Sequence, residues 1–387
     1  MTSKSSGPGN ADPSWRTPFD ADPVPEEDLW FLPGPPDDLD RDPLAPPLPR
    51  ANRRQAIVPQ AWRAAQGDLA AELAKVAALF GALDERLRGL GQGAQHRLAL
   101  LEAAELSWHI GDRVAPDRLG MWVSLRLSSS QDDAQALSRA AWAVRRLAGG
   151  SGPEVDLAVF LGRHDRPNAA EFGHAFIEPP SDLAGRLAEW QEAMAEAEGL
   201  HPISASALGF HLWQLGEISG AGAAADLEAA VVAARLATQA GPGSEARSGI
   251  VGKSSGRAFK RRTGGALFLP LALAGTGALR RGGEATAILG RWLAGAEASC
   301  LVALLVLERL EAWRRRAEEA AVDWSGRTPG RLIAVLADWP LVSAPMAEKE
   351  TGASRAATQR NLDRLTEAEL IREVTGQGRY RLWTAKL

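Results

Sequence analysis

Apolar residues recur every three or four positions along most of the chain beyond residue 60, which is the spacing of one buried helix face. The segment 68–90 shows this spacing clearly, with Leu69, Leu73, Val76 and Leu83 in one series. The same spacing predicts helices at 96–110, 117–127, 132–148, 181–200, 203–217 and 222–240, and one long helix or a broken pair at 284–322. The pattern therefore predicts a mainly α fold before residue 325.

The apolar series become shorter after residue 325. The segment "TPGRLIAVLADWP" (328–340) predicts a helix with Thr328 as its N-cap and a proline in its first turn, where no helical N–H is required. Pro340 ends this helix, and Ser343 caps a short second helix. Gly352 follows at a point where the chain must turn sharply. Two short helices separated by a tight connection are thus expected.

A third helix and two strands complete this pattern. Ser354 is placed to cap the segment "SRAATQRNLDRLTEA", in which Leu362 and Leu365 lie one turn apart and face inward. The segments "LIREV" and "RYRLW" flank the turn "TGQG" and predict a two-stranded hairpin. Three helices followed by a small β-hairpin make a winged helix-turn-helix, expected over residues 325–387.

The outward face of the third helix carries side chains that suit DNA. Arginine reaches base edges or phosphates, glutamine pairs with adenine, and alanine lets a helix approach the floor of the major groove. Arginines near a glycine-rich hairpin tip suit backbone or minor-groove contacts. The expected DNA-contacting residues are Ser354, Arg355, Ala356, Gln359, Arg360, Arg364, Gln377, Arg379 and Arg381. The alternative interpretation is a winged helix used for protein contact or dimerisation, because the segment from 328 onward has nine Lys/Arg against seven Asp/Glu.

Composition divides the rest of the chain. Residues 1–50 contain 12 of the 24 prolines and carry ten Asp/Glu against four Lys/Arg, which is typical of a disordered acidic arm. We therefore expect five segments: an arm at 1–54, a helical body at 55–240, a basic Gly/Ser-rich loop at 241–265, a continuation of the body at 266–324, and the terminal module at 325–387.

The basic loop contains two sequence features that are candidates for binding a nucleotide or a nucleic acid. The sequence "GKSS" at 252–255 resembles a phosphate loop, but such a loop needs a glycine at 247, where Arg247 stands. Nucleotide binding is therefore not expected there. The cluster of basic residues is either a solvated loop or a second phosphate-contacting patch, formed by Lys253, Arg257, Lys260, Arg261 and Arg262.

Charge and cysteine content limit the remaining chemistry. The formal net charge of −4 means that any nucleic-acid site must be local. Cys300 is the one cysteine, and its apolar surroundings favour a buried, inert thiol in a reducing compartment. The start of the chain lacks the apolar stretch of a signal peptide, and the apolar run 301–307 is too short to span a bilayer. We expect a soluble cytoplasmic protein that contacts no membrane.

The six histidines form no recognisable site. No His-Glu-x-x-His motif occurs, and a second cysteine for a zinc site is lacking. His109 and His211 lie in apolar helical series and are interpreted as core histidines. We expect no catalytic constellation, no metal and no cofactor.

The C-terminal segment "PLVSAPMAEKETGASRAATQRNLDRLTEAELIREVTGQGRYRLW" resembles the helix-turn-helix of an uncharacterised bacterial family. That family pairs a helical domain of unknown function with this module and is often plasmid-borne in plant-associated bacteria. The segments "ALLEAAELSWHIGDRV", "ALSRAAWAVRRLAGG" and "GALFLPLALAGTGALRRGGEA" also fit its pattern, so the resemblance covers about 55–385.

A fainter resemblance links residues 168–218 to Fic-domain proteins, which transfer AMP with a His-Pro-Phe-x-x-Gly-Asn-Gly-Arg motif after such a helix. Here "SGAGAAADL" (219–227) places Ser219 where the family's base would stand and Leu227 where its phosphate-binding arginine would stand. A serine without a partner does no general-base work near neutral pH. A Fic-like bundle is thus compatible with the body, but the activity is not expected.

Together these observations favour a DNA-binding protein that regulates transcription, with double-stranded DNA as its partner. The non-catalytic body is then expected to assemble the protein, as a homodimer, or to sense a signal. Two alternatives stay open: a divergent Fic-like nucleotidyl transferase, and an interaction protein of the antitoxin or plasmid-maintenance kind.

The acidic arm suggests an intramolecular competitor that mimics the charge of DNA. Deletion of residues 1–50 should then strengthen DNA binding at low salt, because ten carboxylates are removed from the vicinity of the module. Gel shifts with the full-length and shortened chains test this. Equal affinities of the two chains would end the idea.

Overall fold

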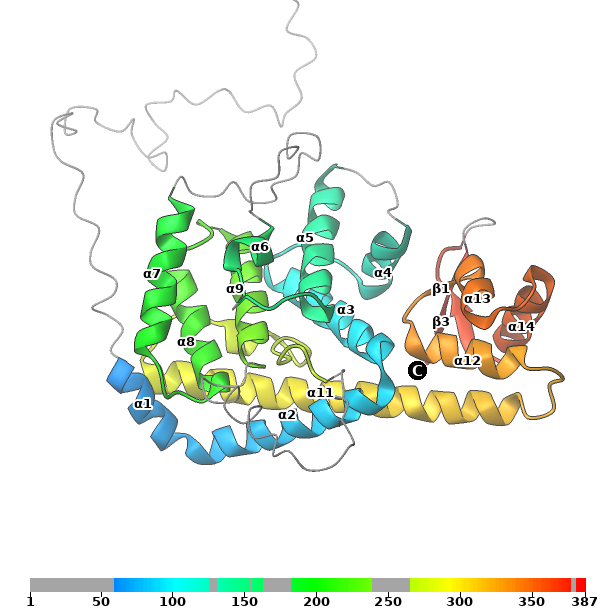
Figure 1. Cartoon of the computed structure of the whole chain (residues 1–387), viewed down its shortest axis with the longest axis horizontal. Coiled ribbons are helices and arrows are strands. Elements are labelled where there is room, and N and C mark those ends of the chain that lie inside the picture. Colours follow the sequence, from blue (N-terminus) through cyan, green and yellow to red (C-terminus); the bar gives the residue numbers. More distant parts are fainter. Residues whose placement is uncertain are drawn as a thin grey trace, which may run out of the picture. The chain divides into compact units, whose positions relative to one another are not determined.

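The computed structural model describes residues 59–125, 131–153, 155–162, 182–220, 222–238, 265–376 and 381–387. The chain divides into Met1–Ala51 and Asn52–Leu387, and all described residues belong to the second unit. The expected acidic arm therefore lies outside the described residues, as does almost all of the basic loop. The described body is helical, as the apolar spacing predicts (Figure 1). Its helices are α1 (Pro59–Asp68), α2 (Ala70–Leu90), α3 (Gln92–His109), α4 (Pro116–Leu125), α5 (Gln131–Ala148), α6 (Leu157–Leu161), α7 (Leu183–Glu196), α8 (Pro202–Leu215), α9 (Ala223–Leu236), the 3₁₀ helix η4 (Thr276–Leu279) and α11 (Ala285–Ala320).

Helix α11 is one continuous helix of 36 residues and settles the choice between a long helix and a broken pair. It packs on α1, α2, α8 and η4 in the body, and its C-terminal part also packs on helix α12 of the terminal module (Figure 1). Its inward face is fully buried at Trp292, Leu307 and Trp313, which belong to a series of buried residues that recurs every three or four positions along the helix. One helix thus belongs to both parts of the described chain.

The body contains a second group of helices, in which α3 packs on α5 and α8 packs on α9. Alanines fill these contacts. Ala99, Ala103 and Ala140 are completely buried in α3 and α5, and Ala230 and Ala234 are completely buried in α9. Small side chains let helix axes approach closely, so the alanine-rich sequence produces a dense helical core.

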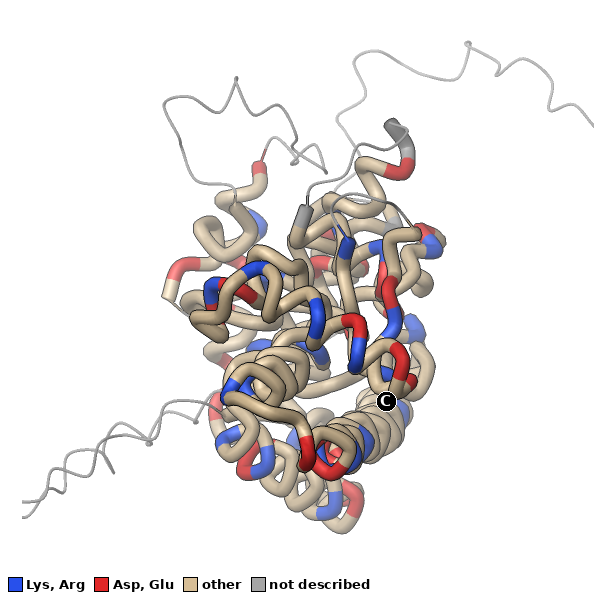
Figure 2. Tube along the Cα trace, turned by 90° about the vertical axis from the view of Figure 1, so that its right-hand side faces the viewer, with Lys and Arg blue, Asp and Glu red and all other residues tan. Residues whose placement is uncertain are grey.

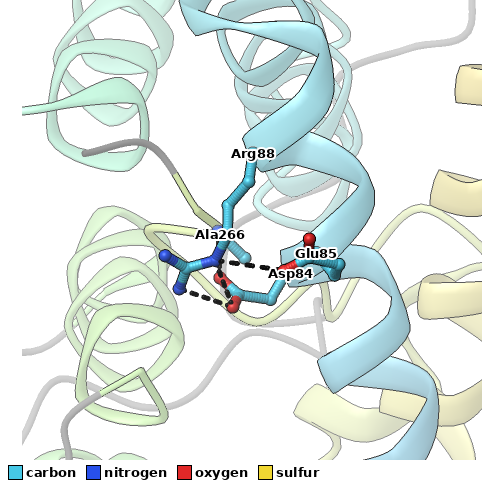
Figure 3. Close-up of polar contacts among 4 residues, drawn as sticks. All are labelled: Asp84, Glu85, Arg88 and Ala266. Atoms are coloured by element: carbon cyan, nitrogen blue, oxygen red, sulfur yellow. Dashed lines mark hydrogen bonds and ion pairs between the residues drawn. The ribbon is translucent and has the colours of Figure 1, made fainter. Parts of the chain in front are cut away.

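Buried or half-buried carboxylates fix the segment that enters η4. Glu102 of α3 is fully buried and accepts hydrogen bonds from the backbone N–H groups of Leu271 (2.8 Å) and Ala272 (2.9 Å). Asp84 of α2 accepts one from Ala266 N–H (2.7 Å) and pairs with Arg88 (2.7 Å), as Figure 3 shows. Side chains of two helices therefore satisfy a backbone segment that forms no sheet or helix of its own.

Ser219 has a partner, contrary to the sequence expectation. Its hydroxyl donates to Glu228 Oε2 and accepts from Trp213 Nε1 at 3.0 Å. Ser219 is completely buried and Glu228 is buried too, so these groups join α8 to α9 inside the core. Leu227 is also buried. This arrangement explains the serine as a packing residue of the body.

The terminal module consists of α12 (Thr328–Asp338), β1 (Val342–Ser343), α13 (Ala344–Thr351), α14 (Arg355–Glu367), β2 (Ile371–Glu373) and β3 (Leu382–Ala385). The three helices and the antiparallel β2–β3 pair confirm the expected winged helix-turn-helix. The sheet has three strands rather than two, in the order β1-β3-β2, because the two residues before α13 pair with β3.

One predicted cap in this module is wrong and two are confirmed. Thr328 is the first residue of α12, whose N-cap is Arg327 without a side-chain hydrogen bond. Ser343 caps α13 by accepting from Met346 N–H, and Ser354 caps α14 by accepting from Ala357 N–H, each at 3.3 Å. Gly352 ends α13 with a φ of 64°, the left-handed conformation that glycine adopts without strain.

The structure also bears on Cys300, on two histidines, and on the expectations about membranes and metals. Cys300 is completely buried, and burial raises the pKa of its thiol to about 12, so it is inert at neutral pH. His109 and His211 are half-buried rather than core residues. Among the helices the structure describes, none combines the length and the apolarity that crossing a membrane requires. The described His, Cys, Asp and Glu residues form no group of three or more that could hold a metal ion.

The buried carboxyl of Glu102 should make stability depend on pH. Burial raises its pKa from 4.5 to about 7, so the folded state binds its proton more tightly than the unfolded state does. The associated stability is complete below pH 4.5 and is lost as the pH rises through 7. Glu102→Gln keeps an oxygen acceptor but carries no charge, so its stability should not fall with pH in this way. Between pH 5 and pH 8 the free energy of unfolding of the wild type should therefore decrease by roughly 1–3 kcal/mol relative to that of Glu102→Gln.

Urea denaturation at both pH values measures this difference. Glu72→Gln serves as the control, because Glu72 is an exposed carboxylate on α2. Parallel pH profiles for the wild type and Glu102→Gln would contradict the assignment of the buried charge.

Candidate nucleic-acid interface

The turn between α13 and α14 is held by a small set of hydrogen bonds. Thr351 is buried, and its hydroxyl donates to the Ala347 carbonyl (2.6 Å) and accepts from Ala353 N–H (3.3 Å). Arg331 of α12 donates to the Thr351 carbonyl (2.9 Å). The three helices of the module therefore meet at one turn, which fixes the direction in which α14 leaves it.

Helix α14 separates an inward face from an outward face. Leu362 and Leu365 are completely buried, as expected, and Thr358 is buried between them and the N-terminus. Thr358 is an inward residue that the sequence analysis missed, because a threonine does not stand out in an apolar series. Arg355, Ala356 and Arg360 are exposed on the opposite face. The helix thus presents the residues that the pattern assigned to DNA.

Arg355 and Arg360 are not engaged elsewhere. Within the described residues, neither guanidinium makes a hydrogen bond or an ion pair. Gln359 lies between them in sequence and donates to Asp363 Oδ1 at 2.8 Å, so its amide is oriented along the helix surface. Two unpaired cations beside a fixed amide, with Ala356 as a small neighbour, form an arrangement that can receive a phosphate or a base edge.

Arg364 differs from this expectation. Its guanidinium lies 4.0 Å from the ring centroid of Trp324, in the connection between α11 and α12. Stacking on an aromatic face uses the planar surface of an arginine and fixes its position. The structure therefore gives Arg364 a role in holding α14 against the connection, while it leaves Arg364 exposed at the protein surface.

The hairpin arginines are only partly described. Arg381 Nε donates to Glu373 Oε2 at 2.6 Å across the β2–β3 pair, and its guanidinium lies 5.1 Å from the ring centroid of Trp383. Gln377 and Arg379 lie outside the described residues. The same is true of the second basic cluster, Lys253, Arg257, Lys260, Arg261 and Arg262. Arg381 is thus pre-positioned by two neighbours, and its charge is already balanced by one carboxylate.

Charge is distributed unevenly along α14. Arg355 and Arg360 stand in its first half, whereas its second half carries the exposed Asp363 and Glu367 against the one exposed arginine Arg364. Figure 2, which faces this end of the protein, shows basic and acidic positions interspersed over the module rather than one basic field. The positive end of the helix dipole adds to the two arginines. A polyanion is therefore favoured more strongly at the N-terminal half of α14 than at its C-terminal half.

The body holds the module through the end of α12. Arg97 of α3 is buried and donates to the carbonyls of Leu336 (3.3 Å) and Trp339 (3.2 Å). These carbonyls lie at the C-terminus of α12, where a cation is favoured by the helix dipole. Burial lowers the pKa of Arg97 to about 10, so the guanidinium keeps its charge at neutral pH. Arg97 was not singled out from the sequence, because one arginine in an apolar series resembles a surface residue.

Three other contacts support this docking. Gly93 of α3 lies so close to the module that a Cβ there would overlap the backbone carbonyl of Asp338. The indole of Trp313 in α11 donates to the Leu370 carbonyl at 2.7 Å, and the Trp313 side chain is completely buried. Arg372 of β2 pairs with Asp117 of α4 at 2.6 Å on the surface. Three body helices therefore fix the module without covering the outward face of α14.

Gly93→Ala should disrupt this docking. The new methyl group meets backbone rather than a flexible side chain, so the free energy of unfolding should fall by about 1–3 kcal/mol or more. Gly81→Ala is the matched control, because Gly81 lies inside α2 with no atom within 4 Å of its Cβ position, and alanine there should stabilise by up to about 1 kcal/mol. Thermal unfolding and hydrogen exchange at 336–339 measure both effects; a Gly93→Ala variant as stable and protected as the wild type would refute the close approach.

Comparison with known families agrees with the geometry of this module. Residues 330–385 match the model of a family described as an HTH DNA-binding domain. No curated protein matches the chain. The match covers α12 from its third residue to the end of β3, so the terminal module is similar to a DNA-binding helix-turn-helix over nearly its full length.

Proposed function

We propose that the protein is a transcriptional regulator that binds double-stranded DNA with α14 in the major groove, N-terminal half first. The observation that supports this most directly is the exposed pair Arg355 and Arg360, which has no partner within the described residues and flanks the small Ala356. Because the acidic residues Asp363 and Glu367 occupy the second half of α14, an end-on approach keeps them away from the phosphates.

The hairpin supplies contacts outside the major groove in this proposal. Arg381 is held by Glu373 and Trp383, and it can exchange the carboxylate for a phosphate with little loss of side-chain entropy. Gln377 and Arg379 would extend the same contact at the hairpin tip. The cluster from Lys253 to Arg262 is a further candidate for phosphate contact. Ser354 contributes by capping α14, and Arg364 by bracing it on Trp324.

The body acts in assembly or sensing in this proposal, not in catalysis. Ser219 stands at the position of the Fic base. It is completely buried and hydrogen-bonded to Glu228 and Trp213, so no substrate hydroxyl can reach it in this conformation. This burial argues against the alternative of a Fic-like nucleotidyl transferase. The alternative of an antitoxin-like interaction protein rests on the acidic arm and depends on the deletion experiment above.

A homodimer would double the contact with DNA, because one small winged helix touches few base pairs and two linked modules gain through effective concentration. The exposed leucines Leu301 (48%) and Leu305 (42%) lie one turn apart on α11 and offer an apolar contact for a second copy.

Replacement of the exposed pair tests the proposed function. Arg355→Ala and Arg360→Ala should each weaken binding to the gene's own upstream DNA by about 1–3 kcal/mol if the side chain reads a base. If the side chain contacts a phosphate instead, binding should weaken equally for all DNA sequences. The slope of log Kd against log salt concentration should then decrease by about 1. Gel shifts and anisotropy titrations over a range of salt concentrations distinguish these outcomes.

Arg314→Ala provides the matched control, because Arg314 is exposed on α11 and makes a surface pair with Glu318 (2.9 Å). It should bind as the wild type does. Sedimentation of the saturated complex gives the number of protein copies per site. Binding that ignores salt, or wild-type affinity in the Arg355→Ala/Arg360→Ala double variant, would exclude this mode of recognition.

A further inference from the structure

A cavity of about 350 Å³ lies where the body meets the terminal module. One side is formed by α3 and α4, which contribute His96, Gly120 and Ser124. The other side is formed entirely by the module, through Trp339 after α12, Ser343 of β1 and Leu382 of β3. The cavity is open to solvent at Ser124, which is exposed. Sites for small ligands begin near 300 Å³ and favour domain interfaces. The cavity therefore has the size and the position of a ligand site.

The chemistry of the lining selects a class of ligand. No Lys, Arg, Asp or Glu is found among the described residues that line the cavity. Burial lowers the pKa of His96 below its ordinary value of 6.5, so its ring is uncharged at neutral pH and offers one donor and one acceptor. A charged ligand would lose its hydration without gaining a partner. An uncharged ligand loses far less on entering the cavity.

Apolar and polar groups are separated within the lining. The Trp339 ring lies 6.2 Å from the His96 ring, centroid to centroid, and the two planes are inclined by 59°. This aromatic wall suits a flat apolar group. The Ser343 hydroxyl accepts from Met346 N–H, which leaves its proton for a second partner, and the Ser124 hydroxyl is exposed at the end of α4. A ligand with one hydrogen-bonding group can thus be oriented between serine and histidine.

A ligand in this cavity would touch residues of the module that neighbour the DNA contacts of the proposed function. Leu382 directly follows Arg381 of the hairpin, and Ser343 caps α13, the helix before α14. Arg372 of β2 forms an ion pair with Asp117 of α4, so the sheet already contacts α4, one of the two helices that line the cavity. A ligand that contacts both sides favours one arrangement of module and body over others. Such a preference is what couples binding of the ligand to binding of DNA.

We propose that this cavity binds a small, uncharged, largely aromatic molecule with one hydrogen-bonding group, and that its occupation stabilises the docked module and changes its affinity for DNA. The regulatory part rests on the proposed function, whereas the binding part does not.

Covalent filling of the cavity tests both parts without knowledge of the natural ligand. The thiol of Ser124→Cys reacts with benzyl methanethiosulfonate to form a mixed disulfide, with release of methanesulfinate. Cys300 stays unmodified because it is buried and its pKa is raised to about 12. Glu105→Cys, on the exposed face of α3, carries the same benzyl group away from the cavity. A 2-sulfonatoethyl methanethiosulfonate adduct at Ser124→Cys tests a charged group of similar size.

The benzyl adduct at Ser124→Cys should raise the melting temperature by about 2 °C or more and change the Kd for the upstream DNA by about fivefold or more. The benzyl adduct at Glu105→Cys and the sulfonatoethyl adduct should do neither. A lower melting temperature, or no change after complete labelling shown by mass spectrometry, would overturn the ligand site. A raised melting temperature with an unchanged Kd would retain the site and overturn its regulatory role. If the unlabelled wild type does not bind DNA, the proposed function fails, and the melting temperature alone decides on the site.

Discussion

The buried guanidinium of Arg97 at the C-terminus of α12 is the interaction on which the arrangement of this protein depends. A charged group in a protein interior needs hydrogen-bond partners, and here the carbonyls of Leu336 and Trp339 both accept from one terminal nitrogen of Arg97, while its Nε has no partner among the described residues. Those carbonyls have no partner inside their own helix, so the body completes a helix end that belongs to the module. Gly93 allows this contact, because any side chain there would overlap the Asp338 carbonyl. The DNA-binding module is thus packed against the body and is not a separate domain on a flexible linker.

This construction has a consequence for recognition. A helix-turn-helix on a flexible tether searches for DNA by itself, whereas a docked module presents α14 in a direction set by α3 and α11. The contact of Trp313 with the Leu370 carbonyl fixes the end of the segment that follows α14, and the stacking of Arg364 on Trp324 fixes one side of α14. The exposed Arg355 and Arg360 then project from a helix whose direction the body fixes. Such preorganisation reduces the entropy lost on binding.

The apolar spacing of the sequence was sufficient for the long helices and for the inward face of α14, since Leu362 and Leu365 follow a simple periodic rule. It missed the five-residue helix α6, which lies in a passage that the sequence predicts to be rich in loops. It failed where a residue's role depends on a distant partner. Strand β1 has two residues, too few for an alternating pattern, and one of them, Ser343, also serves as a cap. Arg364 and Arg381 looked like free cations, because Trp324 and Glu373 become their neighbours only after folding. Arg97 looked like a surface residue for the same reason.

The candidate site shows the same limit in its electrostatics. The nearly balanced charge of the module suggested weak attraction to DNA, but a sum does not report where each charge lies. The acidic side chains Asp363 and Glu367 follow Arg360 along α14, so the sign of the surface changes within about one turn. At physiological salt the field of a surface charge fades over roughly 8 Å, which is less than the length of α14. The N-terminal half can therefore attract phosphates more strongly than the C-terminal half, where Asp363 and Glu367 outnumber Arg364. In the proposed function this difference, rather than the net charge, orients α14 in the groove.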